Sequence, residues 1–525
     1  MTEHTRRAGL LLPLFSLRAA RDWGIGEIGD LPAVMRWLRD GGQRLLQLLP
    51  INELPDHETS PYSALSGMAI DPRYISLHLL PDHTVSGEDV VSDASMASRL
   101  LEVRRSSRVR YAEVRALKEA AFRRAYARFE EAELRLATPR AQAFADFVRE
   151  QEWWLDTYAI FRALRERFGG QSWTEWPAPL RDRHEDAIVD ARHQLAGEVR
   201  YRQYLQWVAH EQWTSARRAG HGVALFGDLP FMVALDSADV WARQDEFRLD
   251  ASLGVPPDMF SETGQDWALP VYRWDVMERG GFEWLTARAR RNADLFDGYR
   301  VDHLVGFFRT FFREPSGDSG FTPADEPEQT VLGERMLRLF LASGATIVAE
   351  DLGVVPDFVR ASMTRLDVPG CKVFRWERRW LEDGQPFVDP ADYPVRSVAT
   401  TGTHDTEPLV TWWVNAPQAE RLAVLSLPLV RQRLGEPLDG LAASAALPDE
   451  VREALIEVVV ASASELVILP IQDVFGWADR INTPAVVDEI NWTWRLPWPL
   501  ESIEEQPDAT RVKALLKLLA GRYGR

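Results

Sequence analysis

The chain has 525 residues and a formal net charge of -18, with 46% hydrophobic and 27% charged residues. This composition is typical of a globular protein, and no apolar run is long enough to span a membrane. The negative charge argues against nucleic acid as a partner, because phosphate binding needs a basic surface. A single cysteine excludes an internal disulfide framework and a cysteine-based zinc site, and it favours a reducing, cytoplasmic location.

Eight short apolar runs, each ending in polar residues, recur along the chain. They cover residues 10–15, 45–51, 223–229, 296–302, 346–351, 371–376, 397–403 and 466–471. Pro13 interrupts the first run and Arg18 and Arg21 follow it, so we interpret it as a buried strand rather than a signal peptide. Segments of helical or loop character separate the runs. This alternation predicts an α/β protein, a (β/α)8 TIM barrel over residues 1–525, with a doubly wound sheet as the alternative.

Three connections are too long for simple crossovers and predict insertions in the barrel. Residues 83–220, after the second run, have strong helical patterns and predict a helical subdomain. Residues 230–290, after the third run, are rich in Asp, Pro, Gly and aromatic residues, which favours a substrate-binding loop insertion. Residues 408–465, after the seventh run, are helical again.

The run at 296–302 ends in residues that suit chemistry. Arg300 and Asp302 lie two positions apart, so a strand places both on one face, and His303 follows directly. A fixed cation beside the acid would hold it ionised at neutral pH, as a carboxylate nucleophile requires. A structural Arg–Asp pair at a strand end explains this motif equally well on its own.

Two later runs also end in acids. Glu350 ends the run at 346–351, and Asp405 follows the run at 397–403, directly after His404. In a barrel the carboxyl ends of all strands open on one face, so these acids would converge with the first. Paired carboxylates suit glycoside cleavage, with Glu350 as the proton donor and with Asp405 and His404 bonding sugar hydroxyls. From the spacing alone, a divalent-metal site of clustered acids is an alternative.

A glycine-rich motif at 23–29, Trp-Gly-Ile-Gly-Glu-Ile-Gly, has the glycine spacing of a dinucleotide-binding fingerprint. In that fingerprint the glycines follow a strand directly and open a helix. Here residues 16–23 intervene after the first run, and Pro32 follows closely. Nicotinamide binding is therefore disfavoured.

Ordered motifs extend over nearly the whole chain. They include Trp23-Gly-Ile-Gly-Glu-Ile-Gly29, Ser60-Pro-Tyr-Ser63, Gly227-Asp-Leu-Pro230, Gly254-Val-Pro-Pro-Asp258, Arg300-Val-Asp-His303, Ala349-Glu-Asp-Leu-Gly353, Gly402-Thr-His-Asp-Thr406 and Asn482-Thr-Pro484. With these motifs the chain resembles the 4-α-glucanotransferases, the amylomaltase or disproportionating-enzyme family (glycoside hydrolase family 77) of the α-amylase group.

The resemblance implies retaining transfer of α-1,4-glucan segments on a (β/α)8 barrel, with no cofactor and no metal. By motif, Asp302 is expected to be the nucleophile, Glu350 the acid and base, and Asp405 the transition-state stabiliser. The residues expected to bind substrate or support the site are Tyr62, Asp228, Asp258, Phe260, Trp267, Arg300, His303 and His404. The partners would be α-1,4-glucans and maltooligosaccharides, not nucleic acid or a membrane, and the oligomeric state, monomer or dimer, stays open.

The sequence departs from the family pattern at a few positions beside these motifs. They are Met259, Ala268, Leu269, Glu407, Asp488 and Glu489. None is an expected catalytic group, so the departures bear on acceptor subsites and on the balance between transfer and hydrolysis. The rival functions are an α-1,4-glucan hydrolase and a non-catalytic glucan-binding protein, which the three acids disfavour.

Overall fold

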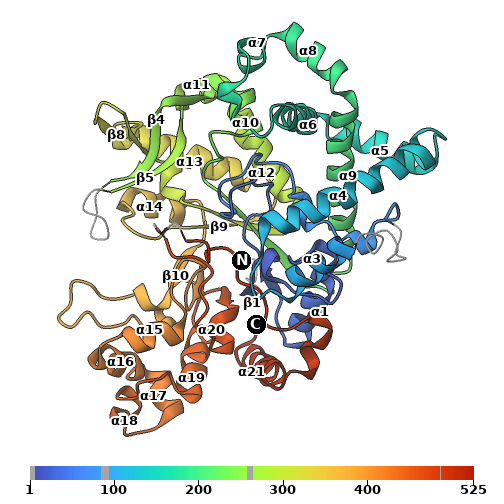
Figure 1. Cartoon of the computed structure of the whole chain (residues 1–525). Coiled ribbons are helices and arrows are strands. Elements are labelled where there is room, and N and C mark those ends of the chain that lie inside the picture. The colour runs from blue at the N-terminus through green and yellow to red at the C-terminus, as the bar shows by residue number, and fades with distance from the viewer. Residues whose placement is uncertain (1–5, 84–93, 257–263, 485, 487) are drawn as a thin grey trace.

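A closed barrel of eight parallel strands forms the centre of the protein (Figure 1). The computed structural model describes residues 6–83, 94–256, 264–484, 486 and 488–525. The barrel strands are β1 Arg7–Leu11, β2 Leu45–Gln47, β3 Ala224–Leu229, β6 Gly298–Val301, β9 Thr346–Ala349, β10 Gly370–Val373, β11 Ser397–Thr400 and β12 Leu466–Pro470. Each overlaps one predicted apolar run. The predicted (β/α)8 barrel is therefore confirmed, and the doubly wound alternative is wrong.

The strands are mostly apolar because the barrel buries them on both sides, and their few charged residues include Asp228 of β3 and Arg300 of β6. All four residues of β11 and all five of β12 are buried, as expected for parallel strands that are covered on both faces. The register between β3 and β6 places Asp228 beside Arg300. This register brings a carboxylate and a guanidinium together at one end of the barrel.

A second, antiparallel sheet lies beside the barrel, with the strand order β5-β4-β7-β8. Its strands are β4 Phe247–Val255, β5 Gln265–Tyr272, β7 Thr310–Arg313 and β8 Ser319–Thr322. Residues 230–290 were expected to form a loop insertion, but their described part contains two of these strands, two α-helices and the start of a third. This sheet forms because β4 pairs with β7, although the barrel strand β6 lies between them in the sequence. Pairing between such distant segments leaves no local sequence pattern. Whether the region binds substrate stays a prediction.

Helices surround the barrel. Seven of the helices in the described residues lie between β2 and β3: α3 Ala94–Arg105, α4 Tyr111–Phe129, α5 Pro139–Glu150, α6 Glu152–Arg167, α7 Ala178–Arg181, α8 Glu185–Gln194 and α9 Ala196–Arg218. The others described are α1 Leu31–Asp40, α10 Ala238–Ala242, α11 Trp274–Arg279, α12 Glu283–Leu295, α13 Glu326–Leu341, α14 Asp357–Arg365, α15 Leu409–Asn415, α16 Gln418–Leu425, α17 Pro428–Leu434, α18 Asp439–Ala442, α19 Asp449–Val460, α20 Ile471–Phe475 and α21 Pro507–Tyr523. Figure 1 shows α15–α19 gathered at one corner. No helix of the described residues is long and apolar enough to cross a membrane.

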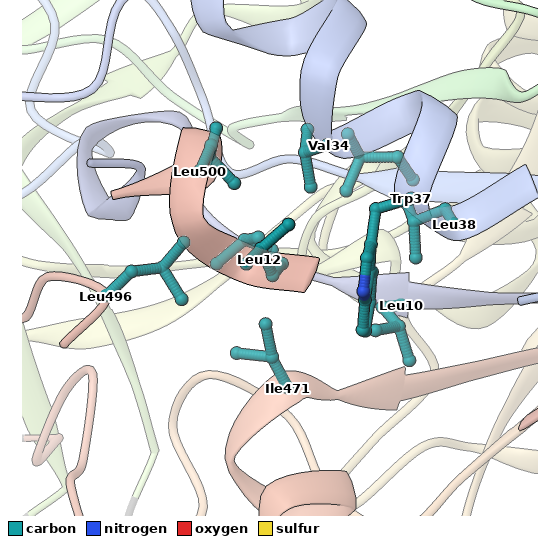
Figure 2. Close-up of a pocket in the computed structure, with 10 residues that line it drawn as sticks. Leu10, Leu12, Val34, Trp37, Leu38, Ile471, Leu496 and Leu500 are labelled. Atoms are coloured by element: carbon teal, nitrogen blue, oxygen red, sulfur yellow. The ribbon is translucent and has the colours of Figure 1, made fainter. Parts of the chain in front are cut away.

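Helix α1 packs on the barrel through a layer of aliphatic side chains and Trp37. Figure 2 shows Val34, Trp37 and Leu38 of this helix facing Leu10 of β1 and Ile471 across a small gap. The gap has a volume of about 10 Å³ and only apolar side chains line it. A space of this size holds at most one water molecule, and it lacks the polar partners that a water needs. This layer is part of the core and not a binding site.

The glycine-rich motif at 23–29 has a structural role. A Cβ on Gly26 would lie 1.9 Å from the carbonyl oxygen of Leu14, so close backbone contact requires the glycine. Glu27 of the motif is buried and pairs with the buried Lys118 of α4, with 2.5 Å between Oε1 and Nζ. This ion pair joins the first barrel loop to the helices between β2 and β3.

We predict that Lys118→Met destabilises the fold by about 3–5 kcal/mol, because it leaves Glu27 as a buried charge without its cation. Burial raises the pKa of Glu27 to about 7, and Lys118 opposes this shift. A raised pKa means that the Glu27 carboxyl group binds its proton more tightly in the folded chain than in the unfolded chain. The contribution of protonated Glu27 to stability is therefore lost as the pH rises through its folded pKa. The loss in the variant should therefore be larger at about pH 8 than at about pH 5.5.

Urea denaturation followed by circular dichroism at the two pH values measures this effect. Arg110→Met is the matched control, because Arg110, which directly precedes α4, forms an exposed ion pair with Glu113 of α4. The control should lose less than about 1 kcal/mol. Equal losses in the two variants would contradict the assigned role of Lys118.

Candidate active site

The three predicted acids lie at the carboxyl ends of the barrel strands. Asp302 follows β6 directly and Glu350 follows β9 directly, while Asp405 lies in the loop after β11. The amide of Asp302 donates to the carbonyl of Leu229 at 3.0 Å, and that of Glu350 donates to Val301 at 3.0 Å. Both acids thus continue the strand ladder. All three line one cleft with a volume of about 1680 Å³, so the structure brings them together as expected.

Arg300 links the residues on one side of this cleft. Its Nε donates to Oδ2 of Asp228 at 2.9 Å. Its Nη2 donates to Oδ1 of Asp302 at 2.8 Å and to the hydroxyl of Tyr62 at 3.1 Å. Burial lowers the pKa of Arg300, but Asp228 and its other partners outweigh burial and raise it well above the ordinary value. The guanidinium therefore stays charged and holds two carboxylates in place.

Tyr62 and His404 form an aromatic pair beside this cation. Their rings stack with centroids 5.4 Å apart, and the tyrosine hydroxyl lies 3.0 Å from Nε2 of the histidine. The same hydroxyl donates to Oδ2 of Asp228 at 2.8 Å. Trp492 packs against both rings, with centroids 5.8 Å and 5.7 Å away. These contacts fix the tyrosine between two polar groups of the site.

Asp405 has an environment that favours its charged form. Its Oδ1 accepts a hydrogen bond from Nδ2 of Asn482 at 2.6 Å, and its Oδ2 lies 3.2 Å from Nε2 of His404. Burial raises its pKa, but His404, Asn482 and Arg300 together outweigh burial and lower it to about 2. This carboxylate is ionised throughout the neutral range.

Glu350 has the opposite environment. Burial is the largest cause that raises its pKa to about 7, and the neighbouring Asp302 adds to the shift while Arg300 opposes it. The carboxylate accepts backbone hydrogen bonds from His303 at 2.8 Å and from Leu352 at 3.0 Å. Near neutral pH, Glu350 is therefore able to hold a proton and to release it.

His303 lines the cleft next to Glu350. It adopts a left-handed backbone conformation with φ of 44°, which turns the chain sharply after the strand. Burial lowers the pKa of its ring to about 4, so the ring is neutral at pH 7. Trp267 of β5 meets this ring edge-on, with centroids 4.9 Å apart. The second sheet thus contributes an aromatic side chain to the cleft.

The expected substrate-binding residues are placed as follows. Those that line the cleft are Tyr62, Trp267, Arg300, His303 and His404. The side chain of Asp228 has 0% exposed surface and lies behind Arg300. Asp258 and Phe260 lie outside the described residues, as does Met259.

The departures from the family pattern lie at different places around the cleft. Ala268 has a φ of 53°, in the left-handed region that favours glycine, and Leu269 lines the cleft. The carboxylate of Glu407 accepts a hydrogen bond from Asn415 at 2.9 Å, and Glu407 is not among the residues that line the cleft. Asp488 and Glu489 are exposed.

Sequence reasoning missed several residues of the cleft wall. Trp376 and Trp380 follow β10, and Trp492 and Asn482 come from the chain after β12. The 20 tryptophans indicated aromatic binding surfaces, but composition does not say which tryptophans face a cleft. Asn482 belongs to the motif Asn482-Thr-Pro484 of the resemblance, and Trp492 belongs to the motif Asn491-Trp-Thr-Trp-Arg495 that follows it; these motifs were their one sequence signal.

Among the described residues, no group of three or more His, Cys, Asp or Glu side chains is arranged to hold a metal ion. Oxygens of the three acids already accept hydrogen bonds from protein groups. Arg300, backbone amides and Asn482 occupy oxygens of the three acids.

Comparison with known proteins gives one consistent answer. The family model described as 4-alpha-glucanotransferase matches residues 12–501. A 4-alpha-glucanotransferase of Thermus thermophilus is 33% identical over 94% of this chain and 95% of its own, and one of Chlamydia pneumoniae is 31% identical over 94% and 92%. The solved amylomaltase from Streptococcus agalactiae in complex with acarbose has a TM-score of 0.81 at 26% identity and covers 99% of both chains. The predicted resemblance is confirmed, and the chain belongs to glycoside hydrolase family 77, the 4-alpha-glucanotransferases.

Proposed function

We propose that this enzyme transfers a segment of an α-1,4-glucan to the 4-hydroxyl of another glucan or of glucose, through a glucosyl ester on Asp302. The observation that carries this mechanism is the contrast between two acids in one cleft. Asp302 is paired with the Arg300 cation, while burial raises the pKa of Glu350 to about 7. A retaining glycosyl transfer needs one carboxylate that attacks and one acid that donates a proton.

In the first step, the Asp302 carboxylate attacks the anomeric carbon and Glu350 protonates the departing glycosidic oxygen. The leaving fragment departs with a new 4-hydroxyl, and a covalent glucosyl ester stays on the enzyme. Asp405, which is ionised at neutral pH, stabilises the positive charge that develops on the sugar ring.

In the second step, Glu350 acts as the base. It takes the proton from the 4-hydroxyl of an acceptor sugar, whose oxygen then attacks the anomeric carbon and releases Asp302. Two inversions restore the α-configuration. An acceptor sugar held against the aromatic side chains next to the site, Trp267 beside His303 and Trp492 beside His404, has a high effective concentration, which favours transfer over hydrolysis.

The charges of the cleft suit a neutral polymer. The cations that line its described part each pair with a carboxylate: Arg300 with Asp302, Arg360 with Asp351, Lys372 with Glu377 and Arg378 with Glu420. These pairs offer no unpaired cation to an anionic substrate, whereas the aromatic wall offers flat apolar surface to sugar rings. The structural relative from Streptococcus agalactiae binds acarbose, which also supports an oligosaccharide ligand. The single cysteine favours a cytoplasmic location, where such glucans would be the donors and acceptors.

We predict that maltotriose alone yields glucose together with maltooligosaccharides longer than maltotriose. Transfer produces both, because each released glucose leaves a maltosyl unit that is passed to another maltotriose. Chromatography of the products over time provides the measurement. Glucose and maltose without any longer product would favour the hydrolase instead.

We predict that Asp302→Asn lowers kcat by about 10⁴-fold or more, since the amide cannot form the glucosyl ester. Binding of amylose, measured by affinity electrophoresis, should be retained. Asp275→Asn, an exposed position on α11, is the matched control and should keep full activity. Turnover that survives in Asp302→Asn would exclude it as the nucleophile.

The pKa of Glu350 predicts the pH dependence of transfer. The acid must be protonated for the first step, and its pKa of about 7 lies above the ordinary glutamate value because of burial. The value of kcat/KM for maltotriose should therefore fall as the pH rises through about 7. Glu350→Gln should remove this dependence and lower kcat by about 10²- to 10⁴-fold. A basic limb at the same pH in Glu350→Gln would assign the dependence to another group.

We predict that Asp228 acts through Arg300 rather than by touching the sugar, because its side chain is fully buried. Asp228→Asn keeps the shape but weakens the charge-assisted bond to Nε, so kcat should fall about 10- to 100-fold. The KM for maltotriose should change less than about threefold, as expected for a residue outside the sugar contacts. A raised KM with an unchanged kcat would show that Asp228 binds the substrate instead.

A further inference from the structure

The segment that follows β10 projects an exposed tryptophan over the cleft. Trp380 lines the cleft and is 53% exposed, and the adjacent Leu381 is fully exposed. The segment is the gold loop that extends outward from β10 in Figure 1. Trp380 is exposed within a cleft, and ligand-binding clefts are typically lined by aromatic and other apolar side chains.

This segment is a rigid hairpin, which we define as residues 376–388. The backbones of Arg378 and Phe387 form an antiparallel β-bridge, and the amide of Arg379 donates to the carbonyl of Pro386 at 2.9 Å. The Arg378 guanidinium lies 4.0 Å from the centre of the Phe387 ring and pairs with Glu420 of α16. Phe387 also stacks on Phe374, with centroids 5.7 Å apart. These contacts hold the base of the hairpin, so Trp380 is presented on an ordered support.

Trp380 lies in the turn at the end of the hairpin. It comes seven residues after Val373, the end of β10, whereas Asp302 and Glu350 each follow their strands directly. Its exposure is also higher than the 24% of the Asp302 side chain. The cleft volume of about 1680 Å³ exceeds the roughly 300–1,000 Å³ of a site for a small ligand. The cleft therefore extends beyond the acids toward the hairpin.

We propose that Trp380 is an outer sugar-binding platform that contacts long α-glucan chains and is not reached by short ones. This inference rests on the proposed glucan transfer, because the ligand is the polymer that the acids cut. The indole offers a flat apolar face on which the C–H face of a glucose ring packs. The neighbouring cation Arg378 is paired with Glu420, which leaves the surface suited to an uncharged ligand.

Substitution of Trp380 tests the platform by comparing long and short substrates. Trp380→Ala should raise the KM for amylose about 3- to 10-fold, as the loss of one aromatic stacking contact predicts. Its KM and kcat for maltotriose should stay within about twofold of the unchanged enzyme. Trp380→Phe, which keeps an aromatic face, should restore most of the affinity for amylose.

Trp153→Ala is the matched control. Trp153 lies on α6, is 37% exposed and does not line the cleft, so its removal should leave both KM values unchanged. Equal effects of Trp380→Ala on amylose and maltotriose, or no effect on either, would overturn the platform. The product pattern of the unchanged enzyme on maltotriose separately tests the transfer itself, so failure of the two ideas is distinguishable.

Discussion

The site depends on one buried cation. Arg300 is placed between Asp228 and Asp302, with the hydroxyl of Tyr62 as a third partner. A largely buried guanidinium without partners costs several kcal/mol, so these oxygens stabilise the site when they are correctly placed around Arg300. The parallel register of β3 and β6 positions the Asp228 carboxylate for this contact, because it sets Asp228 opposite Arg300. Barrel closure and catalytic geometry are thus consequences of the same strand pairing.

The Arg300 cation also influences the pKa values of the acids in the cleft. Arg300 contributes to the low pKa of Asp405 and moderates the raised pKa of Glu350, which burial and the charge of Asp302 dominate. Three carboxylates in one cleft would repel one another if all were charged and alone. Here one is bonded to a guanidinium, one to Asn482 and His404, and one holds a proton near neutral pH. These partners reduce the repulsion between the three carboxylates. They also give each acid a different protonation state or partner, which suits it to a different chemical role.

The barrel and its acids could be predicted because their signals are local. A strand buried on both faces is an apolar run, and a polar residue at its end is visible in the sequence. The second sheet could not be predicted this way, since β4 pairs with β7 across the intervening β6 and the partly exposed β4 lacks a continuous apolar run. The burial of Asp228 was likewise hidden, because a motif identifies a strand end but not which side chain lies behind another. The tryptophans after β10 had no signal beyond composition.

We propose that the chemistry and the chain-length preference depend on different parts of this protein. Asp302 and Glu350 continue the strand ladder of a closed barrel, so their positions are tied to backbone hydrogen bonds and tolerate little change. Trp267, Ala268 and Trp380 lie on the second sheet and on a hairpin, outside that ladder. The departures from the family pattern that line or flank the cleft fall in these outer segments, and none replaces a member of the Arg300 network. Substitution in the outer segments can therefore alter which glucans bind while the geometry of the reacting groups is kept.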